Sequence, residues 1–309
     1  TELAPGCPWP VWAITTDIQK ENIPLFHGLS NELPLNIRKA ENTRSIVTIH
    51  DLIFLRYPEY YHYIDRKIYA YKFRKACQNA DRIIAVSECT KRDIISFFHI
   101  PEEKIDVVYQ GCDAQFKQAV PENTKEEIRR KYQLPQRYIL YLGSIESRKN
   151  LLLIAKALLH IQEPITVIAI GKRTPYAETV EDFLRKNHLE NRMRLLSNIP
   201  FKELPAFYQM ATTFVYPSFF EGFGIPLLEA LNSGVPAIGA TGSCLEEAGG
   251  PHSIYIHPED DKELAKAIEQ TLTDQSLRER MIKEGKKYAI LFEEEKLTKD
   301  LLNVYRKTI

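Results

Sequence analysis

Two glutamates and two glycines lie close together between residues 221 and 229. Glu221 and Glu229 stand eight positions apart, with Gly222 and Gly224 between them. Carboxylates accept paired hydrogen bonds from vicinal hydroxyls and can stabilise positive charge that develops at a sugar carbon. Glycines let a backbone approach a ligand closely. Either glutamate alone also has a structural interpretation, as a carboxylate that complements a helix start or as a solvated loop residue.

The elements around these glutamates predict how they are positioned. The run 214–216 is β-branched and aromatic, which predicts a buried strand. Pro226 suits the first turn of a helix, and Gly234 suits its end, so we expect a helix over 227–232. Strand, glycine loop and helix in this order place backbone N–H groups and the positive end of a helix beside an anionic ligand.

A second turn of this kind carries cations instead of carboxylates. Residues 138–143 predict a strand that ends in Gly143, and residues 151–159 predict a helix. Arg148 and Lys149 fall between the two, where paired cations suit a pyrophosphate. The structural alternative is a solvated pair, although a helix start is electrostatically the wrong end for cations.

A third candidate is His50, which follows an expected strand over 45–49 and precedes Asp51. A histidine at the end of a strand can form hydrogen bonds to a ligand in a cleft, and it can equally be a structural residue. Ser87 ends another expected strand, and we interpret it first as a helix N-cap.

Length and composition limit the choice of protein class. At 309 residues with no net charge, the chain is long enough for about two domains and is not a general nucleic-acid binder. The five cysteines are odd in number and form no CxxC pair, which favours reduced thiols in the cytoplasm. There is no D-x-D motif, so we expect no metal site and no cofactor. The chain begins at Thr1 with a loop-like segment, and we expect a fragment that lacks its N-terminal part.

Short apolar runs alternate with helical patterns along the chain, which predicts βαβ units and an α/β fold with parallel sheets. Four ordered motifs then resemble the retaining glycosyltransferases of family 4, the glycosyl transferases group 1. These motifs are HDL at 50–52, GSIESRKN at 143–150, EGFGIPLLE at 221–229 and GSCLEE at 242–247.

The resemblance implies the GT-B fold, in which two Rossmann-like domains have parallel sheets facing across a cleft. It predicts an incomplete acceptor-side domain over 1–118, a nucleotide-sugar domain over 119–292, and a terminal helix over 293–309 that returns to the first domain.

The resemblance also implies a role for each candidate residue. Glu221 would contact the transferred sugar, Glu229 the ribose hydroxyls, His50 the sugar near its 6-position, and Lys149 the leaving diphosphate. Many members carry an arginine where this chain has Ser144, so Arg148 is the candidate replacement. The catalytic set is His50, Glu221, Lys149 and Arg148, and the donor-binding set is Gly143, Ser144, Arg148, Lys149, Ile199, Glu221, Gly222, Phe223, Gly224, Ile225 and Glu229.

The function that the resemblance implies is metal-independent transfer of a hexose, with mannose one option, from a nucleotide-diphosphate sugar to a glycan or lipid-linked acceptor. Its setting would be the assembly of a surface polysaccharide or glycolipid in the cytoplasm, on the cytoplasmic face of a membrane. The alternatives are a sugar-nucleotide epimerase or a phosphorylase on the same fold, and a donor-binding fragment without turnover.

The segment 60–75 is rich in aromatic and basic residues and has two interpretations. It can be a helix that lies on an anionic membrane surface. It can also be an ordinary amphipathic helix that buries Ile64, Ile68 and Tyr71 against the sheet, which is the interpretation that the sequence favours.

Overall fold

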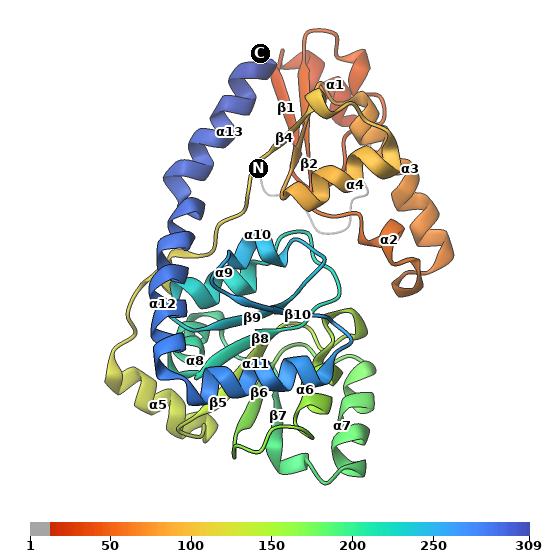
Figure 1. Ribbon diagram of the computed structural model, residues 1–309. Coiled ribbons are helices and arrows are strands. Elements are labelled where there is room, and N and C mark those ends of the chain that lie inside the picture. The colour runs from red at the N-terminus through yellow and green to blue at the C-terminus, as the bar shows by residue number, and fades with distance from the viewer. Residues whose placement is uncertain (1–12) are drawn as a thin grey trace. The chain divides into compact units, whose positions relative to one another are not determined.

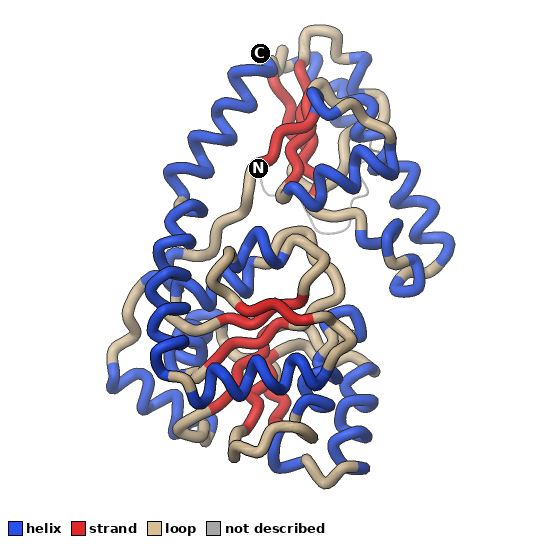
Figure 2. The backbone as a smooth tube through the Cα atoms, viewed as in Figure 1, coloured by secondary structure: helices blue, strands red, loops and turns tan. Residues whose placement is uncertain are grey.

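The computed structural model describes residues 13–309, and these form two compact units. Unit 1 comprises the described residues up to Tyr109 together with Glu294–Ile309, and unit 2 comprises Gln110–Glu293. In each unit parallel strands form a single sheet with helices around it (Figures 1 and 2). The predicted α/β class with two parallel sheets is therefore confirmed. The loop expected at the start of the chain lies outside the described residues.

Unit 1 has a four-stranded sheet in the order β1-β2-β3-β4. Its core is formed by apolar residues of these strands and of the helices between them, as the near-continuous apolar runs of buried parallel strands require. The elements are α1 (Ala13–Lys20), β1 (Leu25–Gly28), β2 (Arg44–Ile49), α2 (Ile53–Arg56), α3 (Tyr63–Asn79), β3 (Arg82–Ala85), α4 (Glu88–Phe98), β4 (Ile105–Val107) and α13 (Glu294–Thr308).

Unit 2 has a six-stranded sheet in the order β10-β9-β8-β5-β6-β7. The chain fills one half of this sheet from β5 to β7 and then returns to the other side of β5 with β8, so the strand order reverses between β5 and β8. The elements are α5 (Glu122–Tyr132), β5 (Tyr138–Leu142), α6 (Leu151–Ala157), β6 (Thr166–Ile170), α7 (Tyr176–Lys186), β7 (Met193–Leu196), α8 (Leu204–Met210), β8 (Thr213–Tyr216), α9 (Ile225–Asn232), β9 (Ala237–Ala240), α10 (Leu245–Gly249), β10 (Ile254–Ile256), α11 (Asp261–Thr273) and α12 (Gln275–Ala289).

The division between the units falls at Tyr109, ahead of the expected boundary at residue 118. The physical reason is Phe116 in the 3₁₀ turn η4 (Ala114–Lys117). Its ring is fully buried and packs edge-on against Tyr208 and Phe201 of unit 2, with ring centroids 5.5 and 5.8 Å away. The segment between Tyr109 and residue 118 thus already packs with unit 2.

The terminal helix α13 packs on the sheet of unit 1. Val304 is buried with Ile46 of β2 and Ile84 of β3. The Tyr305 hydroxyl lies 2.8 Å from Nδ1 of His27, whose Nε2 lies 2.8 Å from the hydroxyl of Thr48. Burial lowers the pKa of His27, so the imidazole is held in the neutral form that suits these two hydroxyl partners.

Helix α3 packs through a different face from the one that the sequence favours. Phe73, Ala76 and Cys77 belong to the core of unit 1, whereas Ile64 and Tyr71 are exposed. The expected burial of Ile64, Ile68 and Tyr71 is therefore wrong. Two apolar stripes run along this helix, and the stripe that contains the small residue Ala76 is the one that fits closely against the strands.

We predict that Val304→Ala lowers the free energy of unfolding by about 1–3 kcal/mol, because it leaves a cavity where α13 meets the sheet of unit 1. Leu302→Ala is the matched control on the same helix, since Leu302 is exposed, and it should change stability by less than about 0.5 kcal/mol. Urea unfolding of the full chain measures both. Equal effects of the two changes would contradict the packing of α13 on unit 1.

Candidate functional site

The reversal of strand order in unit 2 brings the two predicted turns together. The turn after β5 contains Gly143 to Asn150, and the turn after β8 contains Pro217 to Gly224. Both leave the carboxyl ends of neighbouring strands, and ligands of open parallel sheets bind at this end, where the strand order reverses. The Asn150 side chain joins the turns by donating to the carbonyl oxygen of Pro217 at 3.1 Å.

The carboxylate of Glu221 is held through one of its two oxygens. Oε1 lies 2.8 Å from the hydroxyl of Tyr216, 2.9 Å from that of Ser218 and 2.9 Å from Nη1 of Arg148. No hydrogen bond from residues 13–309 reaches Oε2. The side chain keeps 15% of its surface exposed. One oxygen therefore fixes the carboxylate, and the other is left to accept a hydrogen bond from a ligand.

Arg148 is committed to carboxylates, which changes the interpretation of this residue. Its guanidinium lies 2.8 Å from Glu146 Oε1 as well as 2.9 Å from Glu221, and it donates to the carbonyl oxygen of Phe220 at 2.5 Å. Burial alone would lower the pKa of Arg148, but the two carboxylates outweigh that effect and raise it. The positive charge is thus already balanced inside the turn, whereas the sequence interpretation gave it to a diphosphate.

Lys149 has a different environment from its neighbour. Its Nζ lies 5.8 Å from the centre of the Tyr216 ring, and within the described part of the chain it forms no ion pair. The side chain crosses Gly143 so closely that a Cβ at position 143 would lie 3.2 Å from Nζ. The glycine therefore makes room for the lysine, and this cation is available to an anionic ligand.

Glu229 lies on α9 and is almost fully buried, with 7% of its surface exposed. The hydroxyl of Tyr208 donates to its Oε2 at 2.8 Å. Burial raises the pKa of Glu229 to about 7, Tyr208 opposes this rise in part, and the charge of Asp113 adds to it. Hydroxyl donors from a ligand would stabilise the charged form of such a buried carboxylate, because they replace the water that burial removes.

Gly224 fixes how α9 begins. Its φ is 124°, in the region that favours glycine, and a Cβ there would lie 2.9 Å from Leu245 Cδ2 and 3.0 Å from Ala248 Cβ. The chain can therefore turn sharply from Glu221 into the helix that carries Glu229, and no larger residue fits without displacing α10.

Comparison with known proteins places the chain in a family. The model of the glycosyl transferases group 1 matches residues 124–288, and the model of glycosyltransferase family 4 matches residues 3–116. The chain belongs to the group 1 glycosyl transferases. It is 32% identical over 290 residues to the O-antigen chain mannosyltransferase B of Escherichia coli, which covers 91% of this chain and 74% of that protein.

Other relatives of this glycosyltransferase are more distant or longer. The O-antigen chain mannosyltransferase RfbU of Salmonella typhimurium is 26% identical, over 72% of this chain and 59% of its own length. The serotype-specific mannosyltransferase WbdA of Escherichia coli is 30% identical over 82% of this chain, which spans only 32% of that protein.

Solved structures confirm the GT-B fold. A glycosyltransferase from Rickettsia africae has a TM-score of 0.80 at 18% identity, covering 100% of this chain and 84% of that one. HepE of Anabaena, solved in complex with UDP and glucose, has a TM-score of 0.82 at 17% identity, covering 96% and 81%.

The remaining predicted residues of this glycosyltransferase lie at the expected ends of strands. His50 follows β2 in unit 1. Its ring Nε2 lies 2.8 Å from the carbonyl oxygen of Leu29, and its backbone N–H donates to the side-chain oxygen of Asn31. Ile199 follows β7 at the edge of the unit 2 sheet. The Ser87 hydroxyl accepts from the N–H of Thr90, so its prediction as an N-cap is confirmed.

The other donor-binding candidates differ in what they expose. Ser144, Gly222 and Ile225 are partly exposed in the two turns. Phe223 is buried, and its ring packs against Phe292 with centroids 5.4 Å apart. Its side chain therefore belongs to the core, and only its backbone is available to a ligand.

Sequence reasoning missed the residues that support the two glutamates. Tyr216, Ser218 and Glu146 fix Glu221 and Arg148, and Tyr208 holds Glu229. Tyr216 and Ser218 stand inside the motif region, so their position next to Glu221 was a usable signal. Tyr208 lies on α8 and had no such signal, because only the folded chain brings its hydroxyl to the carboxylate on α9.

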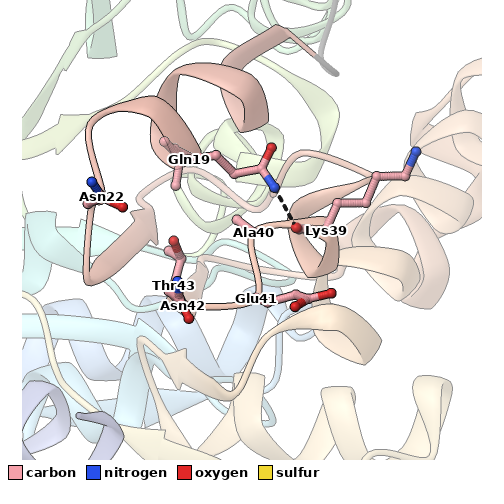
Figure 3. A pocket seen from close by; sticks show the side chains of 8 residues that line it. Gln19, Asn22, Lys39, Ala40, Glu41, Asn42 and Thr43 are labelled. Atoms are coloured by element: carbon pink, nitrogen blue, oxygen red, sulfur yellow. Dashed lines mark hydrogen bonds between the residues drawn. The ribbon is translucent and has the colours of Figure 1, made fainter.

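A separate hollow lies in unit 1, between α1 and the segment before β2 (Figure 3). Its volume is about 360 Å³, and the side chain of Gln19 crosses part of it to donate to the carbonyl oxygen of Lys39 at 2.6 Å. Its residues precede β1 and β2, so it lies at the amino ends of the strands, opposite the edge that binds ligands in such sheets. We assign it no role.

No group of three or more His, Cys, Asp or Glu side chains suited to a metal ion occurs within residues 13–309. The charges at the paired turns of unit 2 are instead the cations and carboxylates described above.

We predict that Glu229 makes stability depend on pH. Its pKa is about 7 in the folded chain, against an ordinary value of 4.5, so between these values the folded chain holds a proton that the unfolded chain releases. The free energy of unfolding should therefore fall as pH rises from about 4.5 to about 7, by about 3 kcal/mol at roughly 1.4 kcal/mol per pKa unit.

Glu229→Gln is the control for this effect, because it keeps an oxygen that accepts from Tyr208 and removes the titration. Urea unfolding at a series of pH values gives the difference between the two proteins. Identical pH dependence in both would show that Glu229 titrates normally.

Proposed function

We propose that the chain transfers a hexose from a nucleoside-diphosphate sugar to an acceptor hydroxyl, with retention of configuration at the anomeric carbon and without a metal ion. The observation that carries the proposal is the set of three groups at one switch point: the anchored carboxylate of Glu221, the buried carboxylate of Glu229 and the uncommitted cation of Lys149. The relatives named as O-antigen mannosyltransferases support a mannosyl donor and the assembly of a polysaccharide.

Each of the three groups has a part in this reaction. Glu229 accepts hydrogen bonds from the ribose hydroxyls, which compensate its burial. The Nζ of Lys149 balances the diphosphate as it leaves, so that no metal ion is required. Glu221 directs its second oxygen to the sugar, where a carboxylate both accepts hydroxyl donors and stabilises an oxocarbenium-like carbon.

The chemical step is a displacement on one face of the sugar. The bond from the anomeric carbon to the diphosphate oxygen breaks, and the bond from that carbon to the acceptor oxygen forms on the same side. The acceptor's proton passes to an oxygen of the departing diphosphate. This route needs no protein nucleophile, and the protein contributes positioning and electrostatic stabilisation.

Arg148 has a positioning role in this proposal. Because its charge is balanced by Glu221 and Glu146, it orients the Glu221 carboxylate and leaves the diphosphate to Lys149. The role of His50 at the donor sugar remains a prediction from the family resemblance. The proposed acceptor is a glycan or a lipid-linked glycan, and the proposed location is the cytoplasm, at the inner face of a membrane.

We predict that incubation with a panel of nucleotide sugars, GDP-mannose and UDP-glucose among them, and a lipid-linked glycan gives a product of the same anomeric configuration as the donor. The reaction should persist in EDTA. Proton NMR of the product reads the configuration. Isomerised donor without transfer would support an epimerase, inversion would contradict the proposed geometry, and activity that EDTA abolishes and Mn²⁺ restores would contradict the role given to Lys149.

We predict further that Lys149→Ala weakens binding of the nucleoside diphosphate about tenfold or more, while binding of the nucleoside alone changes little, because a charge-assisted bond of about 1.5–3 kcal/mol is lost.

Arg148→Lys is the comparison variant. A lysine keeps the charge but cannot bridge two carboxylates and a carbonyl, so kcat should fall while diphosphate affinity is retained. Calorimetry and initial rates separate the effects, and a larger loss of diphosphate affinity in Arg148→Lys would reverse the two assignments.

A further inference from the structure

Helix α3 has a second apolar stripe that faces solvent. Ile64, Ile68 and Tyr71 are spaced at i, i+4 and i+7, so they lie on one side of the helix, and they expose 70%, 46% and 57% of their surface. The opposite side packs in the core of unit 1 through Phe73 and Ala76. Figure 1 shows α3 in orange at the periphery of its unit. Three large exposed apolar side chains in one row are unusual for a surface helix.

Three cations lie on the same side of α3 as these apolar residues. Lys67, Arg74 and Lys75 stand three, ten and eleven positions after Ile64, which places them beside the stripe. None of the three forms an ion pair with another residue of the described chain. Lys72 borders the stripe on its other side, and its charge is balanced by Glu32 at 3.1 Å. The Arg74 guanidinium also lies 5.6 Å from the centre of the Phe98 ring of α4. The face therefore combines apolar area with positive charge that no carboxylate among residues 13–309 neutralises.

The neighbouring residues support this arrangement. The Tyr63 ring packs against the Arg66 guanidinium and the Lys67 ammonium, each 5.4 Å from the ring centre. The sequence of α3, YIDRKIYAYKFRKACQN, contains five basic residues and a single acidic one. The whole chain has equal numbers of acidic and basic residues, so this concentration of positive charge is local.

We propose that this face of α3, formed by Ile64, Lys67, Ile68, Tyr71, Arg74 and Lys75, docks on an anionic lipid surface. A helix of 17 residues is about 25 Å long and can lie flat, with the isoleucines and the tyrosine among the acyl chains and the cations at the headgroups. Tyrosine suits this boundary, because its ring is apolar and its hydroxyl stays hydrated. No helix among residues 13–309 has the length and apolarity to cross a bilayer.

Charge complementarity decides between possible occupants. A second protein chain would cover the apolar stripe, but it would leave three desolvated cations that need matching carboxylates. A bilayer that contains anionic lipid offers acyl chains to the apolar stripe and negatively charged headgroups to the cations beside it. The inference deepens the proposed location at a membrane and rests on that part of the proposed function. The test needs no sugar transfer, so its failure is distinguishable from failure of the proposed reaction.

The test is co-sedimentation of the full chain with vesicles of phosphatidylcholine, with and without phosphatidylglycerol. The chain should sediment with the anionic vesicles, weakly with the neutral ones, and less as salt is added. The triple variant Ile64→Gln/Ile68→Gln/Tyr71→Gln should lose binding at least tenfold. The variant Lys67→Gln/Arg74→Gln/Lys75→Gln should lose a larger factor, at roughly fivefold for each cation near the surface.

The matched control is Ile290→Gln/Leu291→Gln, which removes two exposed apolar side chains from unit 2. It should bind vesicles as the unchanged chain does, and circular dichroism should show that all variants fold. Unchanged binding in both α3 variants would overturn the proposal, as would equal binding to neutral vesicles. Self-association in sedimentation equilibrium that disappears in the apolar variant, without vesicle binding, would identify the face as an interface between copies and would also overturn it.

Discussion

The site in unit 2 depends on a buried cation shared by two carboxylates. A guanidinium that is largely removed from water is stable only where opposite charge and hydrogen-bond acceptors replace its hydration. Arg148 finds both in Glu146, from its own turn, and in Glu221, from the turn after β8. The same ion pairs therefore hold two chain segments in register at the switch point. Since Glu221 also accepts from Tyr216 and Ser218, its carboxylate has one orientation.

The two glutamates of the motif have opposite environments, and this difference suits different tasks. Glu221 is surrounded by hydrogen-bond donors, which fix the direction of its carboxylate. Among residues 13–309, only the Tyr208 hydroxyl donates to the Glu229 carboxylate, and burial raises the pKa of Glu229 to about 7. The first carboxylate is therefore prepared before any ligand arrives. In the proposed function the second carboxylate receives hydroxyl donors from the ribose, which would offset the electrostatic cost of its burial.

Much of this arrangement could be predicted from the sequence, because it depends on local residue preferences and on the spacing of the motifs. The strands around 138–143 and 214–216, the helix start at Pro226 and the glycine at 224 all follow from periodicity and from turn chemistry. The environment of Arg148 could not be predicted, because its partner Glu221 lies far along the chain and the pairing exists only in the folded sheet. The buried face of α3 could not be predicted either, since both of its stripes are apolar and only the shape of the sheet selects one.

The central claim is that one switch point in unit 2 binds a nucleoside-diphosphate sugar through three groups with separate tasks. A crystal structure of the chain with an unreactive donor analogue tests it most directly. The account predicts the ribose hydroxyls on Glu229, a diphosphate oxygen beside Nζ of Lys149, and the sugar at the Oε2 of Glu221, with Arg148 still bound to Glu146 and Glu221. A diphosphate bound directly by Arg148, with its ion pair to Glu221 broken, would contradict it.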